Sequence, residues 1–82
     1  MKAKVHVTLK PGILDPQGRA IQQSLATLGF TSVEEVRVGK FMEVELQETD
    51  IAAAEAKIKE MCSKLLANTV IEDYRYEVMS NE

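Results

Sequence analysis

Few side chains in this sequence have the types and spacing that catalysis or metal binding requires. The single histidine, His6, lies between Val5 and Val7, and a general base also needs an oriented nucleophile or substrate within hydrogen-bond reach. The single cysteine, Cys62, follows Ile58 by four residues, which predicts a packed thiol on the apolar side of a helix. One histidine and one cysteine carry no triad or metal-ligand signature. We therefore expect no catalytic residue, no metal site and no cofactor bound by this chain.

Two carboxylates, Glu43 and Glu45, are two residues apart in a predicted strand, so they lie on the same face of the sheet. Acid–base catalysis by such a pair needs surroundings that raise the pKa of one carboxylate above that of the other. Nothing in the neighbouring sequence does this. We interpret the pair as part of a solvated or interface face that can meet a basic patch on another protein.

A possible anion site lies at residues 15–19, where the sequence reads Asp15-Pro16-Gln17-Gly18-Arg19. Free amides at a helix start, a glycine and an arginine can together hold a phosphate. No glycine-rich nucleotide-binding motif accompanies them. Simple capping of the helix by Asp15 is therefore the favoured interpretation, and anion binding stays open as the alternative.

The only tyrosines, Tyr74 and Tyr76, share one face of the last predicted strand with Val78. They can cap the core, but amphipathic aromatic side chains on a terminal strand are also good anchors between subunits, and we favour that role. The predicted interface residues are Arg19, Lys40, Glu43, Glu45, Tyr74 and Tyr76.

The first half of the chain has clear strand and helix signals. Apolar and polar residues alternate over residues 3–9 and predict a strand with one buried face. A helix is predicted over residues 16–28, because Asp15 can cap it, Pro16 suits its first position and Gly29 can end it in the left-handed conformation.

The second half repeats the pattern with an additional strand. Residues 36–38 and 41–46 alternate on either side of Gly39 and Lys40, which suit a two-residue hairpin turn. A second helix begins after Thr49 or Asp50. Asn68 is expected to close that helix in the left-handed conformation.

Residues 70–78 predict the last strand and residues 79–82 a frayed end. The order β-α-β-β-α-β predicts one α+β domain over residues 1–82 with a ferredoxin-like fold, in which two helices cover one face of a four-stranded antiparallel sheet. The other face and the edge strands stay available, so we expect a dimer or a tetramer, with the last strand contributing to the dimer.

Composition excludes several classes of partner. The chain has 82 residues, of which 45% are hydrophobic and 28% charged, with a net charge of -3; it has no basic stripe for nucleic acid and no apolar run long enough to span a membrane. One cysteine agrees with a reducing compartment, so we expect a cytoplasmic protein. RNA binding through the sheet is disfavoured because Glu43 and Glu45 stand where base-stacking aromatics are needed. A stand-alone, small-ligand-binding regulatory module remains the alternative function.

Four segments, taken in order, resemble the PurS small subunit of phosphoribosylformylglycinamidine (FGAM) synthase. They are the first strand ending in Lys10, then Leu14-Asp15-Pro16-Gln17-Gly18, then Val36-Arg37-Val38-Gly39-Lys40, and finally Cys62 with Leu65-Leu66-Ala67-Asn68-Thr69-Val70-Ile71-Glu72-Asp73-Tyr74. The resemblance extends over nearly the whole chain.

The resemblance implies a role in purine biosynthesis within an ATP-dependent, glutamine-using C–N ligase. In such a complex a glutaminase subunit releases ammonia, and a large synthase subunit, expected to hold ATP and Mg²⁺, transfers the ammonia to formylglycinamide ribonucleotide. The small subunit is implied to be a non-catalytic dimer that assembles the other two and assists ammonia transfer.

Overall fold

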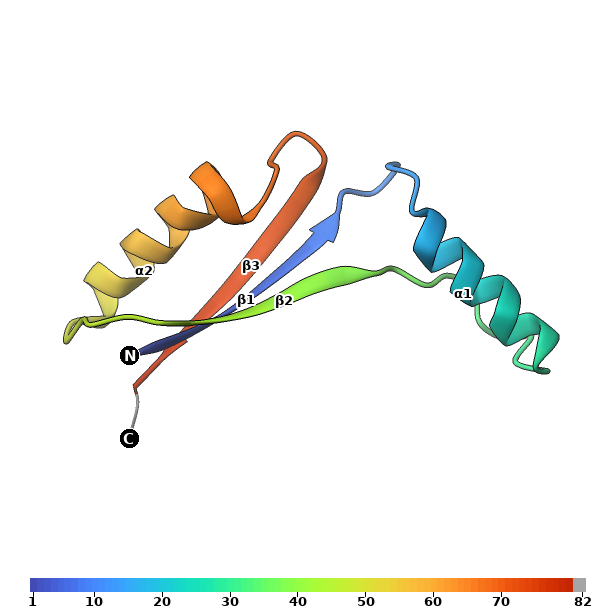
Figure 1. Cartoon of the computed structure of the whole chain (residues 1–82), viewed down its shortest axis with the longest axis horizontal. Helices are drawn as coiled ribbons and strands as arrows, with labels where there is room; N and C mark the ends of the chain where they lie inside the picture. The colour runs from blue at the N-terminus through green and yellow to red at the C-terminus, as the bar shows by residue number, and fades with distance from the viewer. Residues whose placement is uncertain (81–82) are drawn as a thin grey trace.

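The computed structural model describes residues 1–80, which form three strands, two α-helices and one π-helical turn (Figure 1). In chain order they are β1 (Lys2–Leu9), α1 (Pro16–Thr27), β2 (Gly39–Glu45), α2 (Ile51–Met61), the π-helical η1 (Cys62–Leu66) and β3 (Glu72–Met79). The fold is therefore α+β, as predicted.

The sheet is antiparallel, with β1 in the centre and the strand order β2-β1-β3. Val5 of β1 lies opposite Met42 of β2 and Tyr76 of β3, so the apolar positions of all three strands share one face. The predicted alternation of β1 is confirmed, because Val5 and Val7 are buried.

The core lies between this sheet face and α2. Ile58 and Cys62 are fully buried against the apolar side chains of β1, and both project from the same side of the continuous α2 and η1. The packed position predicted for Cys62 is confirmed, and burial raises the pKa of its thiol, which makes the nucleophilic thiolate scarce.

The predicted four-stranded sheet is wrong for the part of the chain that the structure describes, because no hairpin forms at Gly39. β2 begins at Gly39 and continues through Lys40 without a turn, and a Cβ on Gly39 would lie 2.5 Å from the Val7 carbonyl oxygen and 2.9 Å from the Thr8 methyl carbon. Glycine is thus required for close approach to β1. Residues 31–38 return beside α1 instead of forming a strand, since the Val38 amide donates to the Asp15 carboxylate at 2.9 Å and the Gln22 side chain donates to the Glu34 carbonyl at 2.8 Å.

The prediction that both helices cover the sheet is also wrong. Only α2 packs on it, whereas α1 and the returning residues 28–38, together called the arm, extend beyond the end of the sheet (Figure 1). The radius of gyration is 16.2 Å, against about 12 Å for a compact domain of this length. A single protomer is therefore extended, with extents of 49 × 30 × 14 Å.

The ends of α1 form as predicted. The Asp15 side chain accepts from the Gly18 amide at 2.9 Å. At the other end Gly29 has φ +101°, and the amides of Gly29 and Phe30 donate to the carbonyls of Ala26 and Leu25 at 3.1 and 2.9 Å. This is the Schellman arrangement, which satisfies carbonyls that the helix leaves free.

The start of α2 is also confirmed, since the Asp50 side chain accepts from the Ala53 amide at 3.1 Å. Its predicted end is wrong: η1 ends at Leu66, the following Ala67 has an extended backbone, and within residues 1–80 only glycines have positive φ. Asn68 instead begins a turn in which its side chain accepts from the Val70 amide. Met79, predicted to be frayed, belongs to β3, and residues 81–82 lie outside the described residues.

Candidate assembly interface

One face of the sheet has no helix on it within the described chain and is lined by polar and charged residues. Across the strands, Lys4 of β1 stands between Glu43 of β2 and Glu77 of β3. In the next row His6 lies beside Phe41, with ring centroids 4.9 Å apart, and opposite Arg75. Phe41 is 51% exposed. This open face therefore combines both signs of charge with an exposed aromatic ring, a composition suited to recognising another protein.

The electrostatics of the open face argue against acid–base catalysis by Glu43 and Glu45. The Lys2 ammonium forms an ion pair with Glu43, and this hydrogen bond and charge lower the pKa of Glu43 and raise that of Lys2. A general acid near neutral pH needs the opposite shift. Glu45, which lies opposite Lys2, completes an acidic row along the edge strand β2.

Tyr74 and Tyr76 lie on the opposite face, toward α2. Their rings are stacked with centroids 6.4 Å apart, and both side chains pack half-buried against the core. Lys40 is on this same side, across from Val7, with its ammonium 3.9 Å from the Glu72 carboxylate. The shared face of the two tyrosines is confirmed, but the predicted interface residues are divided between the two faces of the sheet and the arm.

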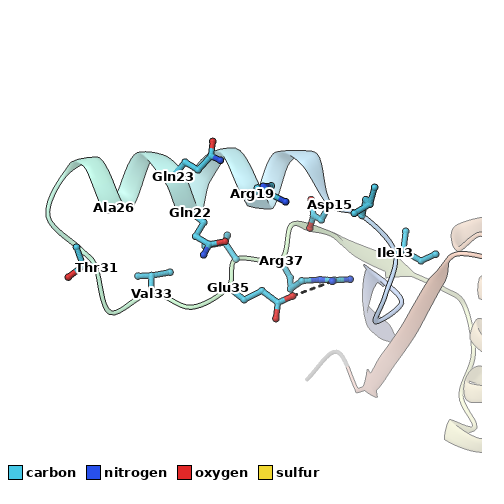
Figure 2. A pocket seen from close by; sticks show the side chains of 12 residues that line it. Ile13, Asp15, Arg19, Gln22, Gln23, Ala26, Thr31, Val33, Glu35 and Arg37 are labelled. Atoms are coloured by element: carbon cyan, nitrogen blue, oxygen red, sulfur yellow. Dashed lines mark hydrogen bonds and ion pairs between the residues drawn. The ribbon is translucent and has the colours of Figure 1, made fainter.

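The arm contains an open cleft of about 750 Å³ between α1 and the returning segment, which no pattern in the sequence indicates. Figure 2 shows Arg19 and Gln22 on the α1 wall, with Glu35 and Arg37 on the other wall. Arg19 is exposed here. The cleft forms because residues 31–37 run beside α1, and only the tertiary path of the chain determines that.

The apolar stripe of α1 stays largely uncovered in a single protomer. Ile21 is 44% exposed, Leu28 73% and Phe30 56%, and none of the three lines the cleft. In α1 the only buried residue is Gly18. Apolar side chains at helical spacing normally face a core, so this exposed stripe is a candidate contact surface.

The alternative of an anion site at the start of α1 is disfavoured. The Asp15 carboxylate itself accepts from the Gly18 and Val38 amides, each at 2.9 Å. These bonds, with the nearby Arg37 charge, lower the pKa of Asp15 below its ordinary value of 3.8, so the position that a bound anion would take is already negative at neutral pH.

Acid is expected to remove the contribution of Asp15 to stability. Because its folded pKa is lowered, this contribution is present above the unfolded pKa and is lost as pH falls through the folded value. Asp15→Asn should therefore be less stable than the parent at about pH 7, with a smaller difference at about pH 3. Urea unfolding at both pH values measures this, with Glu55→Gln as the exposed control; a difference that stays constant with pH would contradict the assignment.

Within residues 1–80 no group of three or more histidine, cysteine or acidic side chains is arranged to hold a metal ion. In that same range, no helix has the length and apolarity that crossing a membrane requires.

The protomer is extended and has two distinctive features, an open charged face and an exposed apolar arm. These features fit the class of small subunits that act within a protein assembly. Comparison with known proteins gives the family. Residues 2–80 match the family model described as PurS, phosphoribosylformylglycinamidine (FGAM) synthase. The chain therefore belongs to the PurS family, the small subunit of FGAM synthase in purine biosynthesis.

Individual relatives agree with this assignment. The chain is 53% identical over 77 residues to the PurS subunit of FGAM synthase from Bacillus subtilis strain 168, covering 94% of this chain and 90% of that protein. The crystal structure of Methanocaldococcus jannaschii PurS superposes with a TM-score of 0.88 at 43% identity, covering 99% and 98% of the two chains. A chain from the PurLQS structure of Thermotoga maritima superposes with a TM-score of 0.86 at 27% identity, covering 95% of each.

Proposed function

We propose that this chain is the non-catalytic small subunit that assembles FGAM synthase in the cytoplasm. It joins a glutaminase subunit to a large synthase subunit that binds ATP and Mg²⁺, and it assists the transfer of ammonia between them. The observation that carries the proposal is the pair of uncovered surfaces, the open sheet face and the apolar arm, on an extended protomer. The PurLQS structure from Thermotoga maritima, one chain of which superposes on this chain, supports it.

Self-association is the first part of this proposal. The described chain has 6086 Å² of accessible surface, whereas a compact monomer of this size has about 4,900 Å². The excess of about 1,200 Å² exceeds the roughly 800 Å² that each partner buries in a standard interface. The second copy covers the apolar stripe of the arm, and the free edge of β3, which carries Tyr74 and Tyr76, extends the contact.

Assembly of the subunits is expected to assist ammonia transfer, because free ammonia is easily lost to solvent. Near neutral pH free ammonia is mostly protonated and diffuses into solvent, so transfer between two active sites benefits from docking that excludes water. The charged residues of the open face suit contact with a partner subunit, since complementary charges orient docking proteins. Membership of the PurS family favours this function over a stand-alone ligand-binding module.

Co-elution of the purified proteins tests the proposal. When this chain is mixed with the large subunit, the glutaminase, ATP and formylglycinamide ribonucleotide, all three proteins should leave a size-exclusion column as one complex. Without this chain the other two should elute separately. A complex of the same size and yield in its absence would overturn the proposal.

A further inference from the structure

The arm joins the sheet at a junction where two segments singled out in the sequence, residues 14–18 and 36–40, lie together. Asp15 connects them, because one carboxylate oxygen accepts from the Gly18 amide in α1 and the other accepts from the Val38 amide in the returning segment, each at 2.9 Å. One side chain thus ties to each other the two chain connections that run between the sheet and the arm.

Arg37 adds a second set of contacts at the same junction. Its Nη2 donates to the carbonyl oxygens of Leu9 at 2.5 Å and Lys10 at 3.1 Å, while Nη1 donates to the Glu35 carboxylate at 3.3 Å. The side chain is 29% exposed, so these charge-assisted bonds are partly shielded from water. They fasten the returning segment to the end of β1.

The remaining contacts indicate that the polar bonds, more than the linker, fix the direction of the arm. Gly18 is buried, and a side chain there would collide with the Val36 carbonyl, so α1 and the returning segment touch directly. The linker contains one turn bond, from the Ile13 amide to the Lys10 carbonyl at 3.1 Å, but Gly12 within it has φ +88° and open space where a side chain would stand. A glycine without neighbours provides little restraint.

We infer that Asp15 and Arg37 form a lock that fixes the angle between the arm and the sheet, with Arg37 as a positioning residue that presents the arm to the second copy. The lock itself is independent of self-association. Only its consequence, the presentation of the arm to a second copy, rests on the proposed function. A planar guanidinium reaches two carbonyls and one carboxylate together, whereas a lysine ammonium cannot reproduce that fork. Both Arg37→Ala and Arg37→Lys should therefore free the arm.

Distances between nitroxide labels on Gln23→Cys and Glu55→Cys, in a Cys62→Ala background, report the angle between α1 and α2. Dilution with unlabelled chain restricts the signal to distances within one protomer. We expect a narrow distribution in the parent and a clearly broader one in Arg37→Ala and Arg37→Lys, with dimer dissociation raised by about tenfold. Lys59→Ala, which removes an exposed cation from α2, is the matched control. It should change neither the width of the distance distribution nor the dissociation constant of the dimer.

A parent distribution as broad as that of the variants, or variants as narrow as the parent, would overturn the lock. Far-ultraviolet circular dichroism checks that each variant is folded, and Arg37→Lys retains the charge if Arg37→Ala does not fold. The intrachain distance is independent of assembly. A narrow parent distribution in a chain that never forms the three-protein complex would therefore contradict the proposed function and leave the lock intact.

Discussion

Replacing Leu28 by lysine is expected to convert the proposed dimer into a monomer. Leu28 is 73% exposed in the protomer, so the substitution costs the isolated fold little, and a cation near the C-terminal end of α1 agrees with the helix dipole. In the dimer the same side chain would enter an apolar contact. Burial of a leucine contributes about 1.5–3 kcal/mol, and a two-fold dimer contains the change twice. The dissociation constant of the dimer should therefore rise about a thousandfold.

Sedimentation equilibrium over a range of concentrations measures this effect. Gln23→Lys is the matched control, because it introduces the same charge into α1 at a position that lines the cleft and not the apolar stripe. The control should remain a dimer. A Leu28→Lys protein with the mass and dissociation constant of the parent would show that the second copy does not cover the arm.

Features that depend on a few neighbouring residues could be predicted from the sequence. The structure confirms the alternation of β1, the caps at Asp15 and Asp50 and the left-handed Gly29. Each of these was predictable because local geometry determines it. The shared face of Tyr74 and Tyr76 follows equally from the two-residue period of a strand.

Features that depend on the path of the chain could not be predicted. Gly39 and Lys40 are suitable turn residues, but they also fit a continuous strand where Gly39 approaches Thr8 closely. The bond from the Val38 amide to Asp15 spans 23 residues, and no local pattern indicates it. The prediction that both helices cover the sheet requires one protomer to bury its own apolar surface, and α1 does not do so because it extends beyond the sheet.

The candidate interface shows the same division. Glu43 and Glu45 were correctly placed together on an open face, whereas the cleft near Arg19 and the exposure of the stripe were missed. Ile21 and Leu28 are spaced seven residues apart, on one face of a helix, and the prediction that both helices cover the sheet implies a buried position for them that the structure does not show. The extended shape supplies the missing information, because it shows that the stripe has no core to join within the described protomer.

Omitting this chain is expected to abolish glutamine-dependent FGAM formation and to spare formation driven by added ammonium salt. The large subunit is proposed to hold the synthase chemistry, so a high concentration of ammonia in solution replaces the delivered ammonia. Holding two reacting centres together replaces an encounter through solvent, and effective concentrations for well-placed groups can reach roughly 10⁵ M. A loss of at least about a hundredfold in glutamine-dependent rate is a small part of that advantage and is the expected result.

The ratio of glutamine-dependent to ammonium-dependent turnover, measured with and without this chain at fixed amounts of the other two subunits, tests the central claim most directly. The proposed assembly function predicts that the ratio falls at least about a hundredfold when the chain is left out and recovers on its addition. An unchanged ratio would contradict the claim that this subunit brings the two active sites together.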